Sequence, residues 1–183
     1  MPRNDAYEPA AELEKGLHPM AKLSDFTGEE RDLLGNAPLA AAAAISVAEP
    51  GGGLREAAAL VGGWRDGARL FGRSELILAI VEQLDPQDRE AQERSAGLRA
   101  RGPQPTFDEI VDEAVDLCGR AVALLSQKAT PQETADYQAF VMHIAKQVAS
   151  AVGEAGAPAH GDERVSRAER AVMREIAEAL GVA

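Results

Sequence analysis

At four places along the chain, a Ser or Thr stands three residues before a Glu and directly precedes a run of apolar residues at helical spacing. In such a capping box, the hydroxyl accepts a hydrogen bond from the backbone N–H of the Glu. The Glu carboxylate in turn accepts one from the backbone N–H of the Ser or Thr. The four boxes pair Thr27 with Glu30, Thr106 with Glu109, Thr130 with Glu133 and Ser166 with Glu169. Because caps and periodicity agree, the sequence predicts an all-α protein, a single compact bundle of six to eight helices.

Apolar stripes define the helices behind these caps. The stripe after Thr106 consists of Ile110, Ala114, Leu117, Cys118, Ala121, Leu124 and Leu125, and the stripe after Thr130 of Tyr137, Phe140 or Val141, Ile144, Val148 and Val152. Pro38, which follows Gly35 and Asn36, predicts a break in the first helix, with Asn36 capping a buried, Ala-rich helix over residues 39–48. We also expect helices over residues 54–71, from Ser74 to Leu84 and over 86–101, with Trp64 filling space against a closely packed neighbour.

The chain divides into an N-terminal arm and a helical domain. Residues 1–22 have few apolar side chains and are predicted to be a flexible arm, and residues 23–183 form one domain. Prolines at 103 and 105 predict a linker between possible halves 23–101 and 106–183. Residues 27–60 and 130–180 share an order of capped helix, Ala-rich segment, Gly-containing loop and second helix, so a duplication is an open alternative.

Charge and composition narrow the classes of function. The net charge of -11 repels phosphate backbones and anionic lipid surfaces, so neither nucleic acid nor a membrane is an expected partner. One cysteine cannot form an internal disulfide, no apolar run approaches the ~20 residues of a membrane span, and the N-terminus lacks the apolar region of a secretory signal. We therefore expect a cytoplasmic protein.

The loop over residues 153–166 is the first candidate site. Its candidate ligands for a divalent cation are His160 and Asp162, together with Glu169 at the start of the next helix. No specific ligand spacing is present, and Glu169 is already used by the capping box. An ordinary solvated connector is therefore the main interpretation, and a metal site is the alternative.

Other chemically capable residues have simpler explanations. His143 lacks the Glu three residues earlier that di-iron bundles use, so we interpret it as a boundary residue with a hydrogen-bond partner. Cys118 lies on an apolar stripe and is expected to be a small buried side chain. Three glycines at 51–53 lack the Lys-Ser or Lys-Thr of a phosphate loop and predict a turn. The acidic face of the helix after Thr106 is typical of a solvated surface, with partner binding as the alternative.

The C-terminal quarter of the chain resembles the TerB-like tellurite-resistance proteins. The similarity covers residues 140–145, 162–169 and 176–180, where Asp162, Val165, Ser166 and Glu169 occupy matching positions. Where the family has Gly after the Asp, this chain has Glu163. The resemblance implies a helical stress-response protein that binds a divalent cation at the acidic turn. The same segment is similar to bacterial helical proteins that end in a Val-Ser-x-x-Glu helix.

No combination of residues in the sequence specifies a reaction. The leading hypothesis is a non-enzymatic helical module without a cofactor, which acts in interaction or regulation by binding a protein partner or a second copy of itself. The alternative is a TerB-like protein that binds a divalent metal ion near Asp162. An enzyme that uses His143 or His160 is the third hypothesis.

Overall fold

The computed structural model of the chain describes residues 20–48, 53–83, 105–152 and 165–183, all of which are helical or connect helices. The elements in this part of the chain are η2 (Leu23–Asp25), α1 (Gly28–Ala48), α2 (Gly53–Leu70), α3 (Glu75–Gln83), α5 (Phe107–Lys128), α6 (Pro131–Val152) and α7 (Arg167–Leu180). The described residues contain no strand, so the predicted all-α bundle is confirmed. None of these helices is long and apolar enough to span a membrane.

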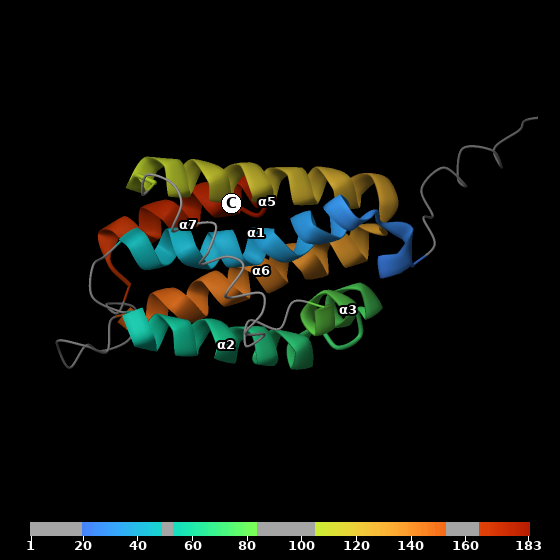
Figure 1. Cartoon of the computed structure of the whole chain (residues 1–183), viewed down its shortest axis with the longest axis horizontal. Helices are drawn as coiled ribbons and strands as arrows, with labels where there is room; N and C mark the ends of the chain where they lie inside the picture. Colours follow the sequence, from blue (N-terminus) through green and yellow to red (C-terminus); the bar gives the residue numbers. More distant parts are fainter. Residues whose placement is uncertain (1–19, 49–52, 84–104, 153–164) are drawn as a thin grey trace, which may run out of the picture.

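The helices form a bundle around a central pair, α1 and α6 (Figure 1). Helices α5 and α7 pack on one side of this pair, and α2 and α3 on the other. Helix α5 runs antiparallel to α1 and parallel to α7. A single cluster of buried apolar side chains joins helices on both sides of the expected linker.

All four capping boxes are present. The backbone N of the capping residue lies close to the Glu carboxylate in each: 2.8 Å for Thr27 and Glu30, 2.7 Å for Thr106 and Glu109, 2.9 Å for Thr130 and Glu133, and 2.7 Å for Ser166 and Glu169. Each box satisfies backbone donors that have no partner inside the helix. The sequence therefore predicted these four helix starts correctly.

The predicted break at Pro38 is wrong, because α1 continues through it from Gly28 to Ala48. Proline has no backbone N–H, so the carbonyl of Leu34, four residues earlier, loses its helical donor. The hydroxyl of Tyr137 on α6 donates to this carbonyl at 2.7 Å. Burial raises the pKa of Tyr137 well above its ordinary value, which keeps the hydroxyl protonated as a donor. Asn36 is consequently an exposed residue inside a helix rather than a cap.

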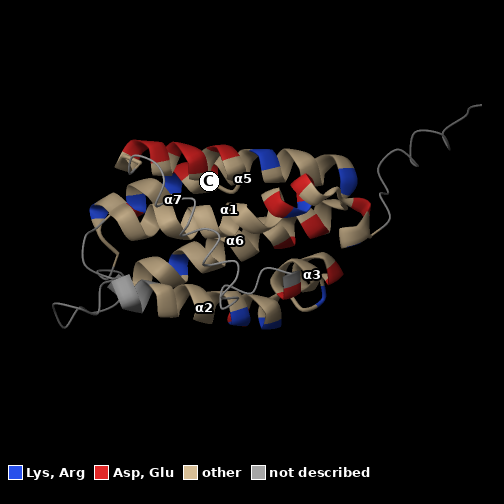
Figure 2. Cartoon of the chain, viewed as in Figure 1, with Lys and Arg blue, Asp and Glu red and all other residues tan. Residues whose placement is uncertain are grey.

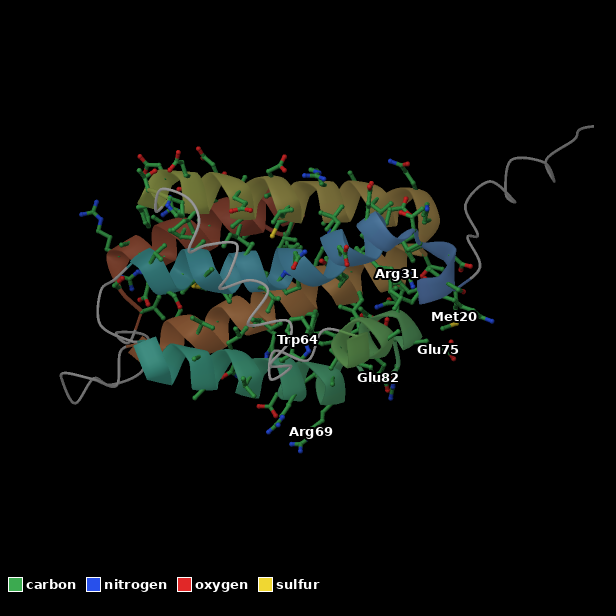
Figure 3. All side chains as sticks on the ribbon, in the orientation of Figure 1. Met20, Arg31, Trp64, Arg69, Glu75 and Glu82 are labelled. Carbon is green, nitrogen blue, oxygen red and sulfur yellow. The ribbon has the colours of Figure 1, made fainter. Side chains whose placement is uncertain are left out.

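Helix α2 approaches α6 very closely at two glycines. A Cβ atom at Gly67 would lie 2.5 Å from Cε2 of Phe140, and one at Gly63 would lie 3.2 Å from Cβ of Gln147. Trp64, between these glycines, packs edge-on against Phe140 with a ring-centre distance of 5.5 Å, and its Nε1 donates to the carbonyl of Val81 at 3.3 Å. Figure 3 shows Trp64 inside the bundle and Arg69 pointing away from it. The space-filling role predicted for Trp64 is confirmed.

One end of the bundle is held by charged and polar contacts. The ammonium of Lys128, at the end of α5, lies 2.6 Å from the carboxylate of Glu30 on α1 and 3.3 Å from the carbonyl of Asp25. It also lies 5.4 Å from the centre of the Phe26 ring. The hydrogen bond from Lys128, followed by those from Thr27, lowers the pKa of Glu30. Glu30 and Lys128 thus connect α1 to the end of α5.

Candidate binding groove between α5 and α7

A groove of about 430 Å³ lies between the N-terminal halves of α5 and α7. The two helices are parallel, so their first turns lie at the same end of the bundle (Figure 1). The α5 side is lined by Phe107, Asp108, Val111 and Asp112, and the α7 side by Ala168, Ala171, Val172 and Glu175. Each side thus contributes apolar residues and at least one carboxylate.

Capping boxes fix where both walls of the groove begin. Thr106 and Glu109 cap α5, and the hydrogen bonds from the backbone and side chain of Thr106 lower the pKa of Glu109. Ser166 and Glu169 cap α7 in the same way. The first lining residues, Phe107 and Ala168, follow within two positions of these caps. The local sequence therefore sets the position of the lining residues on each helix.

The floor of the groove is apolar and is partly closed by the core. Val111 and Val172 are buried at its base, whereas Phe107 is 44% exposed. The small side chains of Ala168 and Ala171 leave the α7 side of the groove shallow. Further along, the helices come closer, since a Cβ at Gly119 on α5 would lie 3.9 Å from the carbonyl oxygen of Ala179 on α7. The groove therefore lies toward the N-terminal ends of the two helices.

The rim of the groove is acidic. Asp108 and Asp112 from α5 and Glu175 from α7 line it, and among the residues that the structure describes no Lys, Arg or His does. Figure 2 shows acidic residues gathered along the N-terminal part of α5. Arg167, Arg170 and Arg174 are exposed on α7 but are not among the lining residues. The groove thus combines an apolar floor with a negative edge.

Of the three cation ligands predicted from the sequence, the structure describes Glu169. His160 and Asp162 lie outside the described residues, as do the predicted helix over 86–101 and most of the N-terminal arm. Glu169 is fully buried, and its Oε2 accepts the backbone N–H of Ser166 at 2.7 Å, as the capping box predicted. Within the described ranges, no three His, Cys, Asp or Glu side chains are grouped so that they could hold a metal ion.

Two other candidates lie in the helical core or at its edge. Cys118 is buried, as predicted, and burial raises the pKa of its thiol to about 12. Its Sγ lies 3.9 Å from the carbonyl oxygen of Ala37. His143 is half-buried, and its Nε2 has no hydrogen-bond partner among the described residues, contrary to the partner expected from the sequence. Neither residue lines the groove.

Little of this groove could be predicted from the sequence. The acidic face predicted for α5 carries Glu109, Glu113, Asp116 and Arg120, and none of these residues lines the groove. The contribution of α7 was not recognisable either, because periodicity assigned Ala171 and Val172 to a packing stripe and gave no sign that α7 lies parallel to α5. The exposed Phe107 directly after a cap was the one additional signal, since a large apolar side chain there begins the helix outside its stripe.

Comparison with known proteins gives no relative from which a role could be transferred. No protein-family model matches the chain, and no curated protein or solved structure matches it significantly. The resemblance to TerB-like proteins therefore stays a prediction.

Proposed function

We propose that this chain is a cytoplasmic, non-enzymatic interaction module whose α5–α7 groove binds a segment of a protein partner. The observation that carries the proposal is the exposed aromatic ring of Phe107 beside an apolar floor in a groove of about 430 Å³. Partner segments commonly bind such helix-lined grooves by inserting apolar side chains. The aromatic ring is also the type of side chain that contributes most to binding at protein interfaces.

The position of Phe107 distinguishes it from the other exposed apolar residues. The large hydrophobic side chains that the structure shows exposed are Met20, Val47, Leu70, Phe107 and Val182. Single exposed apolar residues are common on protein surfaces and need no explanation. Among these five, however, Phe107 alone is aromatic and alone lines the groove.

The chemically capable side chains in the described part of the chain support a role without catalysis. The thiol of Cys118, with a pKa near 12, is a poor nucleophile at neutral pH. The carboxylates of Glu133 and Glu169 are buried in capping boxes, where they accept backbone N–H groups. The single, buried cysteine is also consistent with a reducing compartment.

A peptide-display selection tests the proposal. A random peptide library is selected on the full chain and counter-selected on an Ala168→Trp variant, in which an indole fills the groove from an exposed position. An Ala123→Trp variant is the matched control, because Ala123 is exposed on α5 but does not line the groove. We expect peptides that bind the wild type and the control equally and bind Ala168→Trp at least about tenfold more weakly, a loss typical of an interface hot spot.

Circular dichroism and thermal unfolding establish that the three proteins are equally folded. Peptides that bind all three proteins alike would place the interaction elsewhere and contradict the proposal. A selection that enriches no peptide would contradict it as well.

A further inference from the structure

From the acidic rim, we infer that the occupant of the groove is a basic amphipathic helix, with apolar residues on one face and Lys or Arg beside them. This inference rests on the proposed function and specifies the partner's chemistry. Between the first and last lining residues, the groove extends about 7.5 Å along α5 and about 10.5 Å along α7, roughly one and a half to two helical turns. A short helix laid along it would place apolar side chains on Val111 and Val172 and against Phe107.

Helix capping explains only part of the negative charge at the rim. Asp108 lies in the first turn of α5, where a carboxylate favourably opposes the positive end of the helix dipole. Asp112 and Glu175 lie beyond the first turns of their helices, where that effect has decayed. No hydrogen bond or ion pair joins the side chains of Asp112 or Glu175 to another residue in the described ranges. Their charges are therefore available to a partner.

The geometry of these carboxylates favours several separate cations over one bound ion. Asp108, Asp112 and Glu175 line one groove, but the described carboxylates do not form a group that could hold a metal ion. Lys and Arg side chains on a helix can reach separate carboxylates while their aliphatic stems cover apolar surface. An amphipathic cationic helix thus matches both the rim and the floor.

Charge also argues against a second copy of the chain as the occupant. In a symmetric dimer the same patch would face itself, which would bring two acidic rims together. The net charge of -11 adds a repulsion between copies and attracts a cationic partner instead.

Two peptides of opposite charge test this inference. The first is a helix-forming peptide of Leu and Ala at helical spacing with Lys flanks, and its twin has Glu in place of every Lys. Binding is followed by fluorescence anisotropy with the full chain. We expect saturable binding of the Lys peptide that weakens as salt is added, and no binding of the Glu twin.

Matched charge variants then locate the binding site. Asp112→Asn with Glu175→Gln should weaken binding of the Lys peptide by about tenfold, equivalent to about 1.4 kcal/mol. Glu75→Gln with Glu82→Gln changes the net charge equally on exposed residues of α3, on the opposite side of the bundle (Figure 3), and should change binding less than about twofold.

The possible failures are distinguishable. Equal losses in both pairs of variants would mean nonspecific attraction and overturn the inference. If the Glu peptide binds, or if the peptides selected on the groove lack basic residues, the inferred basic partner is wrong. The proposed function stays intact in both cases. A dimer in sedimentation that Phe107→Ala dissociates would make a second copy the occupant, which also overturns the inference. If no peptide of any charge binds the groove, the proposed function fails with it.

Discussion

Helices α2 and α7 lie on opposite sides of the bundle, and each packs against its neighbour with different side chains. The contact of α2 with α6 is closed, because Gly63 and Gly67 let the backbones approach and Trp64 and Phe140 fill the remaining space. The contact of α7 with α5 is close near Gly119 but opens toward Phe107, where alanines form one wall. The α2–α6 contact is thus fully packed, whereas the α5–α7 contact leaves an apolar surface open at one end.

Adding one methyl group to each contact is the strongest test of this difference. Gly67→Ala should lower the free energy of unfolding by about 2–3 kcal/mol, because the new Cβ overlaps the Phe140 ring, which is packed between Trp64 and Phe71. Gly119→Ala should instead raise the free energy of unfolding by up to about 1 kcal/mol, because its Cβ makes an ordinary contact and alanine favours the helix. Urea unfolding measures both.

Gly62→Ala is a second control, since a Cβ at this exposed position of α2 meets no atom within 4 Å. It should be stabilising by a similar amount to Gly119→Ala. If Gly67→Ala is as stable as Gly62→Ala, the α2–α6 contact is not packed as closely as the structure indicates.

The central pair, on which both regions pack, contains a buried hydrogen bond from Tyr137 on α6 to the carbonyl of Leu34 on α1. Tyr137→Phe should lower the free energy of unfolding by about 1–2 kcal/mol, because it leaves the carbonyl of Leu34 without a donor. Pro38→Ala returns a backbone N–H to that carbonyl. A double-mutant cycle should therefore show a smaller cost of Tyr137→Phe in the Pro38→Ala background. The same cost in both backgrounds would show that the hydroxyl does not replace the missing helical donor.

The ion pair between Glu30 on α1 and Lys128 at the end of α5 should make stability depend on acid. Glu30, which is paired with Lys128, has a lowered pKa in the folded chain. Its contribution to stability is therefore present above the ordinary pKa of 4.5 and is lost as the pH falls through the lower folded value. Glu30→Gln should lower the urea midpoint at neutral pH, and the difference from wild type should disappear in acid.

Asp112→Asn is the comparison for the groove end of α5. Its carboxylate has no hydrogen bond or ion pair to another described residue, so neutralising it should leave the urea midpoint at neutral pH nearly unchanged. A loss of stability equal to that of Glu30→Gln would show that the acidic rim is structural rather than available for a partner.

Local sequence determined where four of the described helices begin. A capping box connects residues three apart, and an apolar stripe repeats within two turns, so both patterns act before the chain folds around them. For this reason, the starts of α1, α5, α6 and α7 and the buried position of Cys118 followed from the sequence alone.

Tertiary structure decided the features that depend on residues far apart. At Pro38, where α1 continues without a break, the free carbonyl of Leu34 accepts a hydroxyl 103 residues away, which no local pattern could indicate. The groove depends likewise on α7 lying parallel to α5, with Glu175 brought to the same rim as Asp112. The sequence by itself determined where α1, α5, α6 and α7 begin and which faces of α5 and α6 are apolar. Only the packing of the helices brought the Tyr137 hydroxyl to the carbonyl of Leu34. Packing likewise placed α5 beside α7, so that an apolar groove floor stays exposed between them.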